Sequence, residues 1–162
     1  MKIEINTRDY GKIEVDETAI IRFDDGIIGF SGYRDYVLLN DGADQSPFRC
    51  LQSIDESGLA FIVLDPCSVR PDYEISIDEN LTELLSIKDA DISDVVVLSI
   101  AVVPDDVKNM SVNLKAPIII NAASRRGAQY IVDGADYGVR HLISDEAERA
   151  RRLSLYDVQK AV

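Results

Sequence analysis

Short runs of alternating apolar and polar residues, separated by turn signals, recur along most of this 162-residue chain. The first two runs are Lys2–Ile5 and Lys12–Val15, and Asp9-Tyr10-Gly11 between them predicts a turn and hence an N-terminal hairpin. No regular alternation of strands with helices is visible, which argues against a parallel sheet. The pattern predicts a mostly β fold, a small closed or pseudo-β-barrel of short antiparallel strands with one or two short helices.

The remaining strands follow the same signals. They are expected at Thr18–Phe23, Asp35–Asn40, Phe48–Ile54, Leu59–Leu64, Tyr73–Ile77, Val95–Val103, Val112–Leu114, Pro117–Asn121 and Ala128–Val132. A turn is expected at Arg126-Gly127, where glycine allows backbone angles closed to other residues. Residues 1–143 are therefore expected to form one β-barrel domain, a length that can bury an ordinary core.

Two segments have helical rather than strand periodicity. Asp78–Lys88 carries acids at its start and leucines at helical spacing, and Asp78 is a candidate N-cap. The second helix is expected from Ser144, as N-cap, to about Ala161. We expect residues 144–162 to form a C-terminal helical tail. A docked helix, a partner-binding helix and a fraying tail are all compatible with its sparse apolar residues, and the fraying tail is favoured because chain ends are often poorly ordered.

The charge balance restricts the class of partner. The chain has 29 acidic and 17 basic residues, for a net charge of -12. Such a surface repels nucleic acid and anionic membranes, which are bound through Lys and Arg, and attracts basic proteins. Solubility alone also explains an acidic surface. The N-terminus already has a strand pattern in place of a secretion signal, so we expect a cytoplasmic protein with Cys50 and Cys67 reduced.

Residues that carry chemistry are sparse. His141 is the only histidine, and it lies in an apolar run that favours a structural role. Neither cysteine belongs to a nucleophile motif, and the spacing of ligands suits neither zinc nor calcium. Gly26-Ile27-Ile28-Gly29 lacks the features of a phosphate-binding loop. We therefore expect no catalytic residue, no metal and no cofactor. A pair of carboxylates remains open in so acidic a chain.

Two segments are unusual enough to be partner-binding candidates. The first is an expected loop that contains both glycines and apolar residues. In the second, a proline interrupts a strand. The candidate residues are Asp24, Asp25, Gly26, Ile27, Ile28, Gly29, Phe30, Asn113, Leu114, Lys115 and Pro117. Both segments place apolar or edge groups where a partner could pair. Core packing explains them nearly as well, and for the first segment alone a loop that plugs the end of a barrel is the favoured interpretation.

The ordered set of segments resembles a known family. Phe23–Phe30, Leu51–Asp55 with Phe61–Pro66, Asn113–Asn121 and Tyr137–Leu142 together are similar to the FliW family of flagellar assembly factors. The resemblance covers roughly residues 1–143, and the tail that follows departs from the shortest family pattern. It implies a compact β-barrel-like domain.

The resemblance also implies two partners. One is cytoplasmic flagellin, and the other is CsrA, a basic RNA-binding repressor of flagellin translation. Free FliW would bind CsrA and relieve the repression of flagellin translation. Accumulating flagellin would occupy FliW, and CsrA would repress translation again. Two other functions stay open: a small-barrel enzyme that uses a carboxylate pair in a deep pocket, and a structural β module with a large apolar face.

Overall fold

The computed structural model describes residues 1–40, 46–87, 89–133 and 136–160, and the side chains of all of these except 89–91 and 155–160. The strands are β1 (Lys2–Asn6), β2 (Lys12–Asp16), β3 (Ile21–Arg22), β4 (Asp35–Asn40), β5 (Phe48–Ser53), β6 (Ala60–Leu64), β7 (Val95–Val102), β8 (Ser111–Val112), β9 (Ile118–Asn121), β10 (Arg126–Gln129) and β11 (His141–Leu142). The α-helices are α1 (Glu79–Leu84) and α2 (Ile143–Lys160), and four 3₁₀ turns lie at Glu17–Ala19, Pro66–Ser68, Asp89–Asp94 and Val107–Asn109. The predicted mostly β fold is confirmed.

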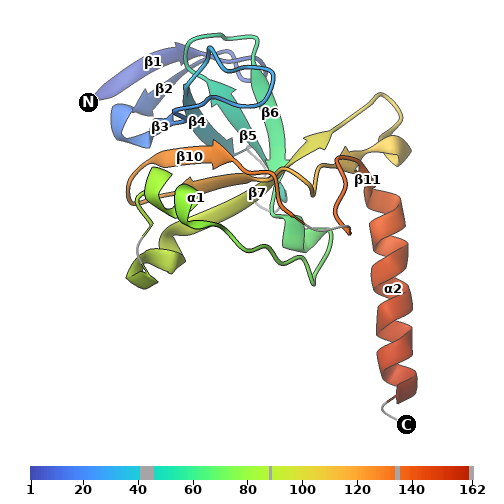
Figure 1. Ribbon diagram of the computed structural model, residues 1–162. Helices are drawn as coiled ribbons and strands as arrows, with labels where there is room; N and C mark the ends of the chain where they lie inside the picture. Colours follow the sequence, from blue (N-terminus) through green and yellow to red (C-terminus); the bar gives the residue numbers. More distant parts are fainter. Residues whose placement is uncertain (41–45, 88, 134–135, 161–162) are drawn as a thin grey trace.

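Within the described residues, seven strands close into a barrel in the order β7-β6-β5-β4-β3-β10-β9 and back to β7 (Figure 1). Closure depends on the length of β7. Its first half, from Val95 to Leu98, pairs with β9, and its second half pairs with β6 and β8. One junction differs from the predicted antiparallel pattern: β3 and β10 pair in parallel, through Arg22 and Arg126.

The barrel interior is filled by large side chains from all around the ring. Phe23, Tyr36, Leu51, Val63 and Ile118 are almost completely buried there. Successive side chains of a strand point to opposite faces, so the neighbouring residues need cover on the outside of the barrel. Three parts of the chain provide it: the β1–β2 hairpin, α1, and the segment that carries Val69 and Tyr73.

Helix α1 covers β9 and β10 from outside, with Leu81 and Leu85 packed against Ile119. Ile118 and Ile120 point into the barrel instead. Both faces of β9 are therefore buried, which explains a run of three isoleucines without polar alternation. Asp78 caps α1 as predicted, because its Oδ1 accepts a hydrogen bond from the Leu81 N–H at 2.8 Å.

The predicted N-terminal hairpin is confirmed, with Lys2 opposite Asp16 and Asn6 opposite Lys12. The hairpin lies over the outer face of β4, where Ile5, Val15 and Val37 form a small core. In Figure 1 it stands at the opposite side of the molecule from α2.

Four predicted strands are wrong or too long by more than one residue. Of Val112–Leu114 only Val112 belongs to a strand, and Ala128–Val132 is a strand only as far as Gln129. Tyr73–Ile77 is extended but pairs with no strand among the described residues: alternate residues pack on the barrel, and the Glu74 N–H donates to the Tyr137 hydroxyl at 3.1 Å. Within Thr18–Phe23 only β3 is a strand. Its first part is a 3₁₀ turn, because the Asp16 carboxylate accepts from the Thr18 N–H and offers the backbone a local alternative.

The turn predicted at Arg126-Gly127 lies immediately before these residues, at 122–125, and both residues belong to β10. Arg125 takes the positive φ of 60° that the turn needs. Gly127 is required for packing instead, since a Cβ there would lie 2.6 Å from the Phe23 ring. Ser144 is also not the N-cap of α2, because the helix already begins at Ile143.

Candidate partner-binding site

The loop from Asp24 to Phe30 combines buried and exposed apolar residues. Two tight turns shape it: the Gly26 N–H donates to the Phe23 carbonyl at 3.0 Å, and the Phe30 N–H donates to the Ile27 carbonyl at 2.7 Å. Ile27 is only 2% exposed and packs with the barrel core, whereas Ile28 is 61% exposed. The two interpretations of this loop therefore apply to neighbouring residues: Ile27 closes the barrel, and Ile28 is presented to solvent.

Gly26 fixes the shape of this loop. Its φ is +68°, and a Cβ added there would lie 2.6 Å from the Ser31 backbone. No L-residue fits without displacing the chain. Gly29 also has a positive φ, of +88°, but it faces open space. The turn that presents Ile28 and Phe30 is thus set by backbone geometry at Gly26, and the Phe30 ring also packs edge-to-face on Phe61, with 5.5 Å between the ring centroids.

The second candidate segment, Asn113 to Pro117, is mainly structural. The Asn113 Oδ1 accepts hydrogen bonds from the Lys115 and Ala116 N–H groups, both at 3.0 Å, and so forms a local turn. Leu114 and Pro117 are buried. Of these residues, Asn113 and Lys115 alone are partly exposed, so this segment offers a partner little surface of its own.

Gln129 joins the two candidate segments, which lie far apart in the sequence. Its Oε1 accepts from the Ile28 N–H at 2.9 Å, and its Nε2 donates to the Ala116 carbonyl at 3.1 Å. Sequence reasoning missed Gln129, because a polar residue at the end of a strand pattern gives no signal of two distant bonds. The structure therefore brings both candidates to one place, beside the end of β10.

A hollow of about 220 Å³ opens at this place, between the loop, β10 and α1. Its lining residues are Asp25, Gly26, Asp78, Asn80, Leu81, Leu84, Ala128, Gln129 and Tyr130. We call it the α1 groove. Its floor is apolar and its rim carries two carboxylates.

The two aspartates of the loop have different roles. The Asp24 carboxylate lies 2.8 Å from Arg126 Nη1 and 3.7 Å from Arg22 Nε, so it ties the loop to β3 and β10. Asp25 is exposed and makes no hydrogen bond or ion pair with any residue that the structure describes. Only Asp25 is therefore available to a partner.

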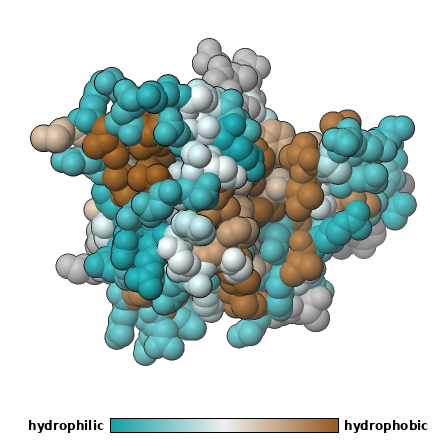
Figure 2. Space-filling model, turned by 90° about the horizontal axis from the view of Figure 1, so that it is seen from above, coloured by the Kyte–Doolittle hydropathy of each residue, from teal (hydrophilic) through white to brown (hydrophobic). Residues whose placement is uncertain are grey.

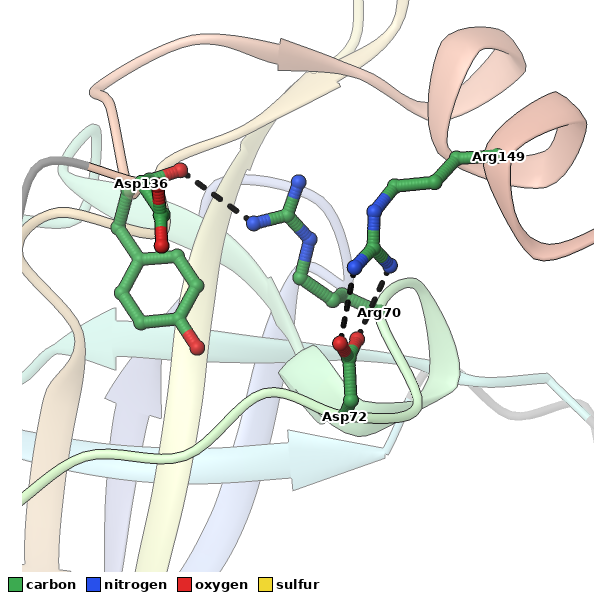
Figure 3. A pocket seen from close by; sticks show the side chains of 5 residues that line it. Arg70, Asp72, Asp136 and Arg149 are labelled. Atoms are coloured by element: carbon green, nitrogen blue, oxygen red, sulfur yellow. Dashed lines mark hydrogen bonds and ion pairs between the residues drawn. The ribbon is translucent and has the colours of Figure 1, made fainter. Parts of the chain in front are cut away.

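A second charged cluster lies at the base of α2, and no motif in the sequence predicted it. The Arg70 guanidinium donates to Glu146 at 2.9 and 3.1 Å, and their side chains are only 11% and 5% exposed. Figure 3 shows Arg70 turned toward the Asp136 carbonyl and Arg149 paired with Asp72 through two bonds. These contacts dock the first turns of α2 on the barrel, so this part of the helix is not a fraying tail.

His141 takes part in the same cluster. Its Nε2 accepts from the Gly138 N–H at 2.7 Å, and its Nδ1 lies 3.0 Å from a Glu146 oxygen. The ring proton is then assigned to Nδ1, where it can be donated to Glu146. Both ring nitrogens hold neighbouring segments together, which supports the structural interpretation of this histidine.

The cysteines lack the properties of nucleophiles. Burial raises the pKa of the Cys50 and Cys67 thiols, which favours the neutral form, whereas a reactive cysteine needs a lowered pKa. Within the described part of the chain, no group of three His, Cys, Asp or Glu residues is arranged to hold a metal ion. Neither described helix has both the length and the apolar character needed to cross a bilayer.

Known proteins resemble this chain over most of its length. The family model described as FliW protein matches residues 4–143. The chain is 39% identical over 148 residues to the flagellar assembly factor FliW of Thermoanaerobacter pseudethanolicus, which spans 91% of this chain and 97% of that protein. The corresponding protein of Alkaliphilus metalliredigens is 37% identical over 150 residues, or 93% and 91% of the two chains.

The same relationship is found among solved structures. A crystal structure of a flagellar assembly factor FliW matches with a TM-score of 0.79 at 37% sequence identity, over 87% of this chain and 96% of that one. The family match ends at residue 143, where α2 begins. The division into a barrel domain of 1–143 and a tail of 144–162 stays a prediction.

Proposed function

The chain belongs to the FliW family of flagellar assembly factors, and we propose that it acts in the cytoplasm as a partner switch that binds flagellin and antagonises a CsrA-type translational repressor. The family membership carries this proposal. When flagellin is scarce, the free protein binds the repressor and flagellin synthesis proceeds. When flagellin accumulates, it occupies the protein and the repressor is released.

The net charge of -12 supports the second half of the switch. An RNA-binding repressor presents a basic surface, and an acidic partner is steered toward it. Once docked, the same charge opposes an approaching RNA backbone. At physiological ionic strength this repulsion extends over about 8 Å, so it acts only close to the RNA site.

A catalytic role has less support. A carboxylate-pair enzyme needs an acid with a raised pKa. Hydrogen bonds from the Thr18 N–H, Arg149 and Arg151 lower the pKa of Asp16, Asp72 and Glu148 respectively, which is the opposite of what a general acid needs. We propose that the protein acts by binding alone.

A structural module would need a broad apolar face for obligate association. On the face drawn in Figure 2, apolar residues instead form separate patches with hydrophilic residues between them. This distribution is compatible with a protein that stands free between transient partners.

Calorimetric titration tests the switch. The purified protein is titrated with flagellin and with the repressor, separately and then in competition, at two salt concentrations. We expect binding to both, mutual exclusion, and weaker repressor binding at the higher salt. Simultaneous binding of both partners would exclude the switch, and absence of binding to either would exclude the whole proposal.

The loop residue Ile28 can be tested for a part in either interaction. Ile28→Asp changes an exposed side chain, and Val107→Asp is a matched control, since Val107 is 65% exposed and lies outside the loop, in the 3₁₀ turn Val107–Asn109. We expect Ile28→Asp to weaken binding of at least one partner and Val107→Asp to leave that interaction unchanged. Ile27 must stay intact in this test, because it is buried. If Ile28→Asp and Val107→Asp bind each partner with equal affinity, the loop is not part of the interface.

A further inference from the structure

The α1 groove has the shape of a site for a protruding side chain. Leu81 and Leu84 of α1 form one side of its floor, and Ala128 and Tyr130 form the other. Its volume of about 220 Å³ lies below the roughly 300–1,000 Å³ of sites that enclose a small molecule. A single apolar side chain from a protein partner fits such a hollow better than a cofactor.

The walls of the groove are held in place without a partner. Gly26 fixes the turn of the loop, and Gln129 bonds the loop to the barrel wall. Asp78 caps the helix on the other side. A site that is already formed loses little conformational entropy on binding, so it can hold a short segment with useful affinity.

The charge around the groove selects the partner. Asp25 and Asp78 lie on its rim, and no Lys or Arg lines the part that the structure describes. Helix α1 with its N-cap, residues 78–84, has three acidic residues and no Lys or Arg. The surroundings are thus more acidic than the chain as a whole.

We infer that the α1 groove is the docking site for the basic RNA-binding repressor, through a segment in which Lys or Arg flanks one apolar side chain. The apolar side chain enters the floor, and the flanking cations lie against the rim, with Asp25 as the unpaired acid that meets one of them. This inference rests on the proposed function and adds to it the surface and the sequence type of the partner.

Two variants test the groove with the full-length protein and the purified repressor. Asp25→Lys reverses the free rim charge, and its control, Glu14→Lys, makes the same change on the exposed side of β2. Asn80→Trp fills the groove, and its control, Glu83→Trp, lies on the same helix outside the lining. Urea unfolding establishes that all four variants remain folded.

We expect Asp25→Lys and Asn80→Trp to weaken repressor binding about tenfold or more, and the two controls to change it less than about threefold. Wild-type affinities for both groove variants would overturn the inference while leaving the proposed function intact. If the wild-type protein itself failed to bind the repressor, the proposed function would fail and the inference with it. Losses equal in variants and controls would point to general charge or fold effects and would also overturn it.

Discussion

Gly26 shows how a single residue sets the geometry of the candidate site. Gly26→Ala forces a Cβ against the Ser31 backbone at a φ of +68°, so we expect a loss of about 1–3 kcal/mol in the free energy of unfolding. Gly32→Ala is the control, because Gly32 has open space around it and no positive φ. We expect that change to be within about 1 kcal/mol of neutral, and urea denaturation measures both. A neutral Gly26→Ala would mean that the loop can relax.

Two buried tyrosines differ in whether the hydroxyl is paired. The Tyr73 hydroxyl donates to the Leu114 carbonyl at 2.8 Å, whereas the Tyr36 hydroxyl is buried without a partner among the described residues. We expect Tyr73→Phe to cost about 1 kcal/mol and leave a carbonyl unpaired. Tyr36→Phe should be neutral or slightly stabilising. The difference between the unfolding midpoints of the two variants at pH 7 tests whether only the Tyr73 hydroxyl is hydrogen-bonded. An equal loss of stability in both variants would contradict this.

The same two residues predict how stability depends on alkaline pH. Burial raises the pKa of Tyr36 and of Tyr73 to about 12, from an ordinary value near 10. Between pH 10 and 12 the unfolded chain has lost these protons and the folded chain keeps them, so stability falls as pH rises. Between pH 7 and pH 11 the free energy of unfolding of Tyr36→Phe should fall less than that of wild type. If both fall equally, Tyr36 does not contribute to the loss of stability at alkaline pH.

At the scale of an element, the attachment of α2 depends on one buried ion pair. Glu146→Ala leaves the largely buried Arg70 guanidinium without its carboxylate, and we expect a loss of about 3 kcal/mol in the free energy of unfolding. Glu148→Ala on the same helix removes exposed pairs with Arg151 and Arg152, which contribute less than about 1 kcal/mol. Thermal unfolding compares the two. Equal effects would show that α2 is not docked through Glu146.

The elements were predictable where local chemistry and tertiary packing agree. Strands such as Asp35–Asn40 and the cap at Asp78 follow directly from alternation and side-chain hydrogen bonding. Tyr73–Ile77 alternates because it lies on the barrel, yet it has no strand beside it, and periodicity cannot distinguish these cases. Gly127 was misread as a turn because its role depends on Phe23, over one hundred residues away.

The candidate site was predictable only in part. Glycine chemistry singled out the loop, but the opposite environments of Ile27 and Ile28 depend on the barrel that they meet. Nothing in the sequence linked this loop with Gln129 or α1, because all three come together only through the closure of the barrel. Likewise, the buried charge of Glu146 cannot be distinguished from the exposed acids around it without the fold.

At the scale of the whole molecule, the charge of -12 and the α1 groove should act on different rate constants. Long-range attraction speeds the encounter with a basic repressor and is screened by salt, whereas contacts in the groove slow dissociation. Raising the salt concentration from about 50 to 300 mM should lower the association rate constant about tenfold and change dissociation much less. Stopped-flow mixing measures both constants.

Asn80→Trp should show the opposite pattern, with faster dissociation and little change in association, because it blocks the groove and leaves the net charge unaltered. A salt effect confined to dissociation would place the important charges inside the contact and not in the field of the whole protein.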